Sequence, residues 1–360
     1  MTTSRLRTFG LILAFTMLAG SVARAADAPA NILTYKGQDR DRLIADGARK
    51  EGLVVIYSTM IVNQALRPLA DAFMKKYPFV KATYWRGDIP ELFAKIAAEA
   101  KSDNRIADVI EGSLGEIAVG ANITQPYYSP ASEDMPDVYR DPKGEWLTTR
   151  MNYFGLAYNT KQVSAADVPK SYEDLLDPKW KGKLSWRIDE CCGHILFITS
   201  LRKLWGEDKA MAYFKKLTQQ NIVNFAAGSA RTLVDRVMAG EYPLAVNIFA
   251  HHPLISAGKG ASVATQLFDP APSSAAQIMV LKNVTHPAAS LLFVDFTLSE
   301  EGQKILAAAE YFPARKGVAA LPSIAGAVPA NVGVKENFIS PLEVAAMKAR
   351  SSEIYNEIFR

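Results

Sequence analysis

Short apolar runs alternate with amphipathic segments along this chain, and this alternation constrains the fold more than any other feature. A polar helix is expected at residues 39–50, and the apolar run at 53–56 is typical of a strand buried on both faces of a parallel sheet. Further strands are expected near 80–85 and at 107–110, and a capping box at 88–91 begins a helix between them. This order of strands and helices predicts a doubly wound α/β layer.

A second α/β unit is expected after the first. Its elements repeat the same pattern of apolar runs and amphipathic segments, with serine caps before two of the helices. They are strands at 153–158, 183–186, 244–248 and 277–281, and helices at 194–205, 208–219, 229–240, 288–297 and 300–309. These elements are enough for two α/β lobes.

The first 25 residues have the parts of a secretory signal peptide. Arg5 and Arg7 form a basic start, residues 9–19 form an apolar run, and residues 23–25 (Ala-Arg-Ala) form a cleavage site with small residues. A retained membrane anchor, the alternative, needs about 18 or more apolar residues. We therefore expect residues 1–25 to be cleaved and the mature protein to work in the periplasm.

Cleavage of this segment changes the charge of the chain. The full sequence has 41 Lys and Arg against 37 Asp and Glu, which gives a net charge of +4. The segment carries three arginines and no acidic residue, so the mature chain has a net charge of only +1. No Lys/Arg tract that could follow a phosphate backbone remains, and nucleic acid is not expected as a partner.

The length of the mature chain predicts two domains. One hydrophobic core stops growing at roughly 250–300 residues, and about 335 residues remain after cleavage. Apolar residues make up 49% of the sequence, which is ample for two cores. No repeat, low-complexity tract or Pro/Ser-rich linker divides the chain. We therefore expect strands of the two sheets to join the domains, which favours a hinge.

Several short segments, in their order and spacing, resemble the extracellular solute-binding proteins of ABC importers. The resemblance is strongest to the branch that holds ferric-iron, thiamine and aminoethylphosphonate binders, and it covers nearly all of the mature chain. The segments are residues 53–59, 107–113, 153–160, 172–183, 238–242 and 312–315.

This resemblance implies a type II periplasmic binding protein fold, an α/β fold of two lobes with a hinge and an interlobe ligand cleft. The implied lobe one is discontinuous, residues 26–152 and 270–360, and lobe two is 153–269. The chain is expected to cross between the lobes near 151–158 and 266–274. The implied function is capture of a small-molecule ligand for an ABC permease in the inner membrane, by a monomer without a cofactor. A ligand-loaded sensor partner of a membrane receptor would use the same fold.

The expected binding residues of lobe one follow its strands. Open α/β sheets bind ligands at the carboxyl ends of their strands, where helix N-termini present free N–H groups. Ser58 and Thr59 follow the first strand, and Ser113 follows a later one, so all three are expected to contact the ligand. For the two serines, capping of the following helix is the alternative.

In lobe two, the clearest candidate for an anionic group is Arg187, which stands directly after a strand. Its guanidinium could bind a carboxylate or phosphonate through two parallel hydrogen bonds. An ion pair with Asp189 or Glu190 is the alternative. Gly228 and Ser229 begin a helix and form a candidate anion-binding turn, with capping as the alternative.

Asn247, Phe249 and His251 are further candidates, and their segment bears on the class of ligand. In the ferric-binding relatives, adjacent tyrosines in this region hold the metal together with a histidine and a glutamate of lobe one. Here residues 249–252 read Phe-Ala-His-His. Ferric iron prefers oxygen ligands, so the usual iron site is not expected and we expect no metal. Adjacent side chains of an extended segment point to opposite faces, so His251 and His252 are not expected to share one ion.

The two cysteines of the chain, Cys191 and Cys192, are adjacent and are both expected at the ligand site. In an oxidising compartment a pair usually forms a disulfide. Neighbouring Cα atoms lie about 3.8 Å apart, which would make this bridge a strained ring. Such a bridge would hold a rigid, apolar turn. Two reduced thiols are the alternative.

We expect the ligand to be a small organic anion, either a carboxylate or a phosphonate. Aromatic residues near the loop edges, Tyr153 and Phe249 among them, could contact its body while an arginine holds its acidic end. A ferric or divalent metal ion is the alternative ligand. The sequence has no Gly-x-Ser-x-Gly, Gly-x-x-x-x-Gly-Lys or His-Glu-x-x-His motif, so no enzymatic activity is expected.

Overall fold

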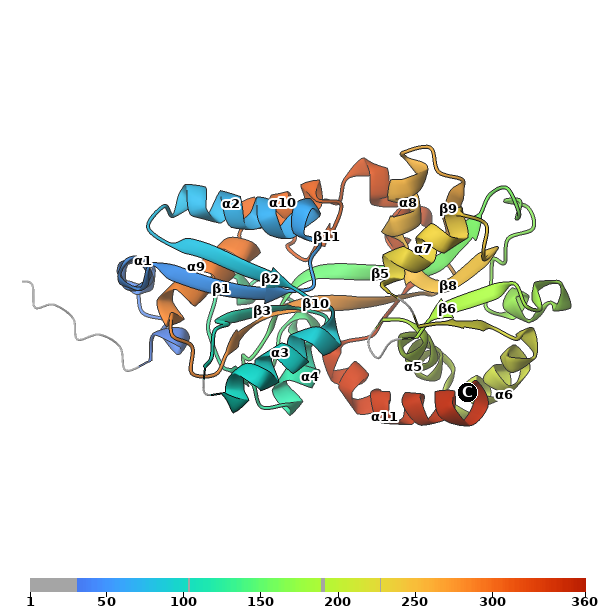
Figure 1. The fold of residues 1–360 in the computed structure, drawn as a ribbon, viewed down its shortest axis with the longest axis horizontal. Helices are drawn as coiled ribbons and strands as arrows, with labels where there is room; N and C mark the ends of the chain where they lie inside the picture. The colour runs from blue at the N-terminus through green and yellow to red at the C-terminus, as the bar shows by residue number, and fades with distance from the viewer. Residues whose placement is uncertain (1–30, 103, 189–191, 227) are drawn as a thin grey trace, which may run out of the picture.

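Two α/β lobes lie along the long axis of the molecule (Figure 1). The structure is a computed structural model that describes residues 31–102, 104–188, 192–226 and 228–360. The predicted signal peptide, residues 1–25, therefore lies outside the described residues. No helix in the described part of the chain is long and apolar enough to cross a membrane.

The first sheet, which defines lobe one, is built on parallel strands. β1 (Leu53–Ser58) pairs in parallel with β2 (Lys81–Arg86) and with β3 (Val109–Gly112). β10 (Ala271–Leu281) runs antiparallel to β3. The short strands β4 (Thr124–Gln125) and β12 (Glu336–Phe338) pair with β10.

Helices cover both faces of the first sheet, as the doubly wound pattern predicts. α2 and α10 lie on one side, and α3 and α4 lie on the other (Figure 1). The predicted capping box at Asp88 and Glu91 begins α3. A π-helical turn, Val62–Leu66, precedes α2. The helices are α1 (Arg40–Glu51), α2 (Arg67–Lys76), α3 (Ile89–Lys101), α4 (Gly115–Gly120), α9 (Pro287–Leu298) and α10 (Glu300–Ala308).

One long strand, β5 (Leu147–Asn159), belongs to both sheets. Its first half pairs with β10 and with β11 (Phe312–Pro313). Its second half pairs with β8 (Leu244–Phe249) and with β9 (Val263–Gln266). The first expected crossing lies within β5, and the second runs from the end of β9 through residues 267–270 into β10. The residue boundaries of the two lobes stay a prediction.

The second sheet defines lobe two. β6 (Leu184–Arg187) pairs in parallel with β7 (Val223–Phe225) and with β8. α7 and α8 lie on one side of it, and α5 and α6 lie on the other (Figure 1). The helices are α5 (His194–Trp205), α6 (Glu207–Leu217), α7 (Ala230–Met238) and α8 (His251–Ala257). Short 3-10 turns lie at Ile32–Thr34, Pro130–Ser132, Asp137–Tyr139, Glu173–Leu176, Pro178–Trp180, Thr218–Gln220, Pro322–Ala327 and Pro329–Val332.

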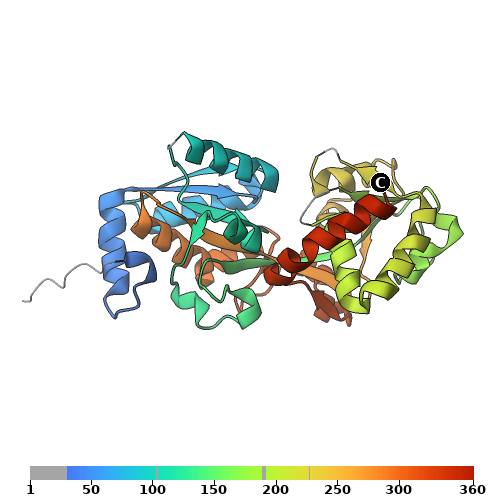
Figure 2. The same ribbon diagram turned by 90° about the horizontal axis from the view of Figure 1, so that it is seen from below.

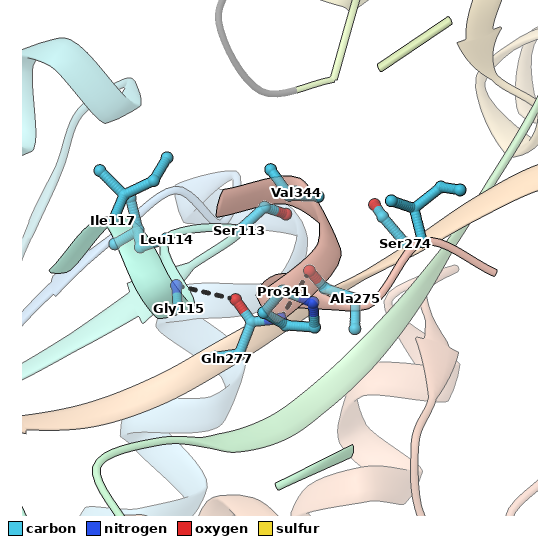
Figure 3. A pocket seen from close by; sticks show the side chains of 10 residues that line it. Ser113, Leu114, Gly115, Ile117, Ser274, Ala275, Gln277, Pro341 and Val344 are labelled. Atoms are coloured by element: carbon cyan, nitrogen blue, oxygen red, sulfur yellow. Dashed lines mark hydrogen bonds between the residues drawn. The ribbon is translucent and has the colours of Figure 1, made fainter. Parts of the chain in front are cut away.

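The C-terminal helix α11 (Pro341–Ile358) connects the two lobes (Figure 2). The sequence groups residues 270–360 with lobe one, but Ile354 and Tyr355 of α11 are buried in the core of lobe two beside Trp186 and Phe197. The first turn of α11 lies beside α4 of lobe one (Figure 3). This helix therefore packs against both lobes.

Candidate functional site

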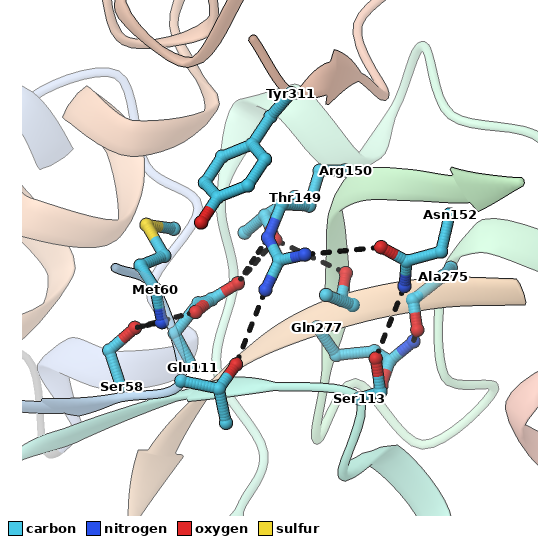
Figure 4. Close-up of polar contacts among 12 residues, drawn as sticks. Ser58, Met60, Glu111, Ser113, Thr149, Arg150, Asn152, Ala275, Gln277 and Tyr311 are labelled. Carbon is cyan, nitrogen blue, oxygen red and sulfur yellow. Dashed lines mark hydrogen bonds and ion pairs between the residues drawn. The ribbon is translucent and has the colours of Figure 1, made fainter. Parts of the chain in front are cut away.

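A buried arginine lies where β1 and β3 end (Figure 4). Arg150 is only 7% exposed and stands on β5. Its Nε donates to Glu111 Oε1 at 3.2 Å. Its two terminal nitrogens donate to Asn152 Oδ1 at 3.1 Å and to Thr59 Oγ1 at 3.2 Å. The guanidinium is thus held among groups from three different strands or their loops.

Glu111 is the residue that holds Arg150 in place. Its carboxylate is 1% exposed and accepts hydrogen bonds from Ser58 Oγ at 2.7 Å and from Thr149 Oγ1 at 3.2 Å, besides the ion pair with Arg150. Parallel pairing of β1 and β3 places Ser58 directly opposite Glu111. A buried ion pair needs such additional hydrogen bonds, because burial removes both charges from water. The register of the sheet therefore builds this site.

Tyr311 joins Arg150 to lobe two. The Arg150 Cζ atom lies 4.7 Å from the centre of the Tyr311 ring, which is a cation–π contact. The Tyr311 hydroxyl accepts from the backbone N–H of Ile61 at 3.2 Å. On its other side, the ring centre of His251 lies 6.1 Å away. Burial raises the pKa of Tyr311, so its hydroxyl stays protonated.

The three predicted residues of lobe one lie in this cluster. Thr59 and Ser113 are half-buried, and Ser113 Oγ accepts from Asn152 Nδ2 at 3.2 Å. Ser58 is fully buried, donates to Glu111 and accepts from the Met60 N–H at 3.0 Å. Ser58 thus supports the site through Glu111. Direct contact of the three residues with a ligand stays a prediction.

In lobe two, Asn247 fixes the turn that leads into α5. Its backbone φ is +56°, a left-handed conformation that asparagine tolerates better than most residues. Its Nδ2 donates to the carbonyls of Cys192 at 3.0 Å and of Gly193 at 2.9 Å. Phe249 lies nearby, with its ring centre 4.9 Å from that of Phe154. These predicted residues therefore lie together.

The cysteine pair is described in part. Cys192 is 6% exposed, packs with Phe154 and Leu196, and is disulfide-bonded. Cys191 is the other cysteine of the sequence and lies outside the described residues. Its place at the ligand site stays a prediction.

The other predicted residues of lobe two end a strand or begin a helix. Arg187 is the last residue of β6 and is half-buried. Ser229 caps α7, since its Oγ accepts from the Thr232 N–H and the Thr232 side chain accepts from the Ser229 N–H. Gly228 has a φ of +81°, and a Cβ there would lie 2.9 Å from Thr232 Oγ1. The local role of Gly228 and Ser229 is therefore a cap, and binding by them stays a prediction.

Tyr153 faces the junction of the lobes. It is half-buried on β5, and its ring centre lies 4.9 Å from that of Phe312. Burial raises its pKa, so it stays a neutral phenol. A ligand contact of Tyr153 stays a prediction.

The expectation of an extended segment at His251 and His252 is wrong. The chain turns into α8 at His251, and the two ring centres lie only 4.4 Å apart. His251 is 3% exposed and packs against Phe312 at 5.3 Å between ring centres. Neither of its ring nitrogens has a hydrogen-bond partner within the described part of the chain. Periodicity missed this turn because the apolar strand pattern continues up to it.

Both histidines are neutral in the folded protein. Burial, together with the charges of Arg231 and Arg150, lowers the pKa of His252 to about 3. Burial, His252 and the same two arginines lower the pKa of His251 well below its ordinary value. Across the described ranges, no group of three His, Cys, Asp or Glu residues lies where it could hold a metal ion.

Acidification is therefore expected to destabilise the protein through His251 and His252. Below pH 6.5 the unfolded histidines take up protons and the folded ones do not, so the free energy of unfolding falls by about 1.4 kcal/mol per pH unit for each. For His252 this loss continues down to about pH 3. Urea unfolding of the parent and of the His251→Asn/His252→Gln variant at pH 7 and pH 5 measures it. Equal pH dependence of the two proteins would contradict the prediction.

Four residues of this site were not among the predicted ones, namely Arg150, Glu111, Asn152 and Tyr311. The sequence did contain a signal for Arg150, because it is the single charged residue in β5, whose other residues are uncharged. Tyr311 directly precedes the segment 312–315 that carries part of the family resemblance. Glu111 is in the same way the single charged residue of β3, whereas Asn152 carries no local pattern that separates it from ordinary strand residues.

Two α/β lobes joined by crossing strands, with polar groups gathered where the strands end, are the architecture of a type II periplasmic binding protein. Residues 104–334 match the family model described as bacterial extracellular solute-binding protein, which is more than half of the chain. The chain belongs to this family. Its members bind small ligands and deliver them to ABC permeases, so the predicted class of periplasmic solute-binding protein is confirmed.

Similar proteins include some that are named for iron and one with a bound sugar phosphate. Iron uptake protein A1 of Synechocystis sp. is 26% identical over 87% of both chains. The structure of AfuA from Actinobacillus pleuropneumoniae, with exogenous fructose-6-phosphate bound, is 25% identical with a TM-score of 0.71, and the match covers 85% of this chain and 98% of that chain. The structure of iron-bound HitA from Pseudomonas aeruginosa is 22% identical with a TM-score of 0.70, and the match covers 85% of this chain and 99% of that chain. The predicted two-lobed fold is confirmed.

Proposed function

We propose that this protein captures a small organic anion between its lobes, through a carboxylate, phosphonate or phosphate group, and delivers it to an ABC permease. The observation that carries this proposal is the buried guanidinium of Arg150 at the carboxyl ends of β1 and β3. In this proposal the protein is exported by means of a cleaved signal peptide and acts as a monomer. It needs no cofactor and carries out no chemistry on the ligand.

The guanidinium of Arg150 suits an anionic group. Arginine has five N–H donors, and the described residues accept three hydrogen bonds from Arg150. A planar fork with remaining donors binds the oxygens of a carboxylate or phosphate in a bidentate manner. The Thr59 hydroxyl accepts from Arg150 and the Ser113 hydroxyl accepts from Asn152, so each O–H remains available as a further donor. Contacts from both lobes form only when the lobes close, so ligand binding favours closure.

Iron is the competing ligand, because several relatives are named for it. Two observations favour an anion over ferric iron. Residues 249–252 read Phe-Ala-His-His where the family resemblance implies adjacent tyrosines, and none of them supplies a phenolate oxygen. Glu111, a possible oxygen ligand, is already bonded to Arg150, Ser58 and Thr149. The fructose-6-phosphate of AfuA shows that a relative binds a sugar phosphate.

A thermal-shift screen of the mature protein tests the proposal. The ligands are fructose 6-phosphate, inorganic phosphate, citrate, aminoethylphosphonate, benzoate and ferric iron. Saturating ligand is expected to stabilise by a few kcal/mol, which raises Tm by several degrees. We expect a response to one or more of the organic anions. A response to ferric iron alone would refute the proposal and favour the metal-ion alternative.

The variant Arg187→Ala tests whether lobe two also holds the anion. We expect the rise in Tm caused by the anion to be smaller in this variant than in the parent. Arg236→Ala is the matched control, because Arg236 lies in the same lobe, is 54% exposed and pairs with Glu241 on the surface. An equal anion-induced rise in Tm for the two variants would show that Arg187 does not bind the anion.

A further inference from the structure

The C-terminal helix α11 is fixed to lobe two along most of its length. Arg202 of α5 donates to the carbonyl of Met347 and to Ser351 Oγ, both at 3.0 Å. Ile354 and Tyr355 of α11 are buried in the core of lobe two. Breaking these contacts would expose apolar surface and unpair polar groups. We therefore expect α11 to move with lobe two as one body.

The first turn of α11, by contrast, rests on lobe one. Pro341 and Val344 face Leu114, the N-cap of α4, and Ile117 of α4 across a cavity of about 30 Å³ (Figure 3). A cavity of this size holds about one water molecule. Because α4 belongs to lobe one, any rotation of the lobes moves α11 across α4 at this place.

Gly115, the first residue of α4, allows this close approach. A Cβ atom on Gly115 would lie 2.9 Å from the Cβ of Pro341 and 3.1 Å from Gln277 Oε1. The side chain of Gln277 can rotate, but the ring of Pro341 cannot move without the backbone of α11. Gly115 is not among the glycines with positive φ. The lack of space, and not the backbone conformation, therefore makes a side chain unfavourable here.

We propose that the contact of Gly115 with Pro341 sets the equilibrium between the lobe arrangements of this protein. A methyl group at position 115 has to push Pro341 away, and α11 transmits that displacement to lobe two because it is fixed there. Interiors are close-packed and respond to such insertions by shifting whole elements. Gly115 would then control ligand affinity without touching the ligand. This inference rests on the fold and does not depend on which ligand is bound.

The test compares Gly115→Ala with Gly120→Ala in the ligand-free protein. Gly120 ends the same helix, and a Cβ there meets no atom within 4 Å, so it controls for the change in helix propensity. The interlobe distance is measured by double electron–electron resonance. Spin labels are attached to unnatural amino acids that replace Ala98 of α3 and Arg236 of α7, which are both exposed and lie on different lobes. We expect Gly115→Ala to shift the distance distribution and Gly120→Ala to leave it as in the parent.

A second change separates this mechanism from a local disturbance. Combining Gly115→Ala with Pro341→Gly removes the contacted atom, so the distribution should return toward that of the parent. A folded Gly115→Ala protein with the distribution of the parent would overturn the proposal. If Gly115→Ala does not fold, Pro341→Gly alone removes the same contact from the side of α11 and should broaden the distribution. An unchanged distribution in that variant would overturn the proposal as well.

Discussion

Replacing Arg150 by alanine is expected to lower the free energy of unfolding by about 3–5 kcal/mol and to abolish anion binding. Arg150 and Glu111 are both almost fully buried and form an ion pair at 3.2 Å. Loss of the guanidinium leaves the Glu111 carboxylate buried without a countercharge, and the hydroxyls of Ser58 and Thr149 remain as its partners. Urea unfolding and calorimetry with the best-binding anion of the thermal-shift screen measure the two effects.

A double variant separates stability from binding. In Arg150→Met/Glu111→Gln, both charges are replaced by neutral side chains of similar size, so most of the lost stability should return. Anion binding should remain absent, because the guanidinium that we assign to the anion has been removed. Binding by a stable double variant would contradict the assignment of Arg150. If Arg150→Ala has the same free energy of unfolding as the parent, the buried ion pair does not contribute to stability as we expect.

The second large effect is expected from Tyr355→Ala in α11. Tyr355 is 8% exposed, and its ring centre lies 4.1 Å from that of His194, at the start of α5. Removing a buried aromatic side chain leaves a cavity, and such changes lower the free energy of unfolding by about 3–5 kcal/mol. Thermal and urea unfolding followed by circular dichroism measure this loss.

Leu342→Ala is the matched control for that prediction. Leu342 lies on the same helix but is 45% exposed, so its truncation should change the free energy of unfolding by no more than about 0.5 kcal/mol. A loss for Tyr355→Ala as small as that for Leu342→Ala would show that α11 does not contribute to the core of lobe two.

Local sequence patterns predicted most helices and strands of this protein. The capping box at Asp88, the serine cap at Ser229 and the apolar run of β1 are short-range signals, and the structure has the expected element at each of them. The prediction failed at His251, where α8 begins directly after β8. Both histidines are compatible with a strand or with a helix, so the residues themselves did not mark the turn.

The site was predicted less completely than the fold. Ser58, Thr59 and Ser113 follow strands, and this position is readable because parallel strands place their carboxyl ends at one edge of the sheet. Arg150 and Glu111 are 39 residues apart and meet through the pairing of β3, β10 and β5. Pairing of this kind depends on which strands become neighbours, and a periodic pattern does not contain that information.

The sequence by itself determined the α/β class, the alternation of strands and helices, and the lack of a tyrosine in residues 249–252. These properties come from the order and the chemistry of neighbouring residues. The tertiary structure alone decided that Arg150 is buried against Glu111, that α11 packs on lobe two, and that Pro341 leaves no room for a side chain at Gly115. Each of these is a contact between residues far apart in the chain, and the packing of whole elements determines it.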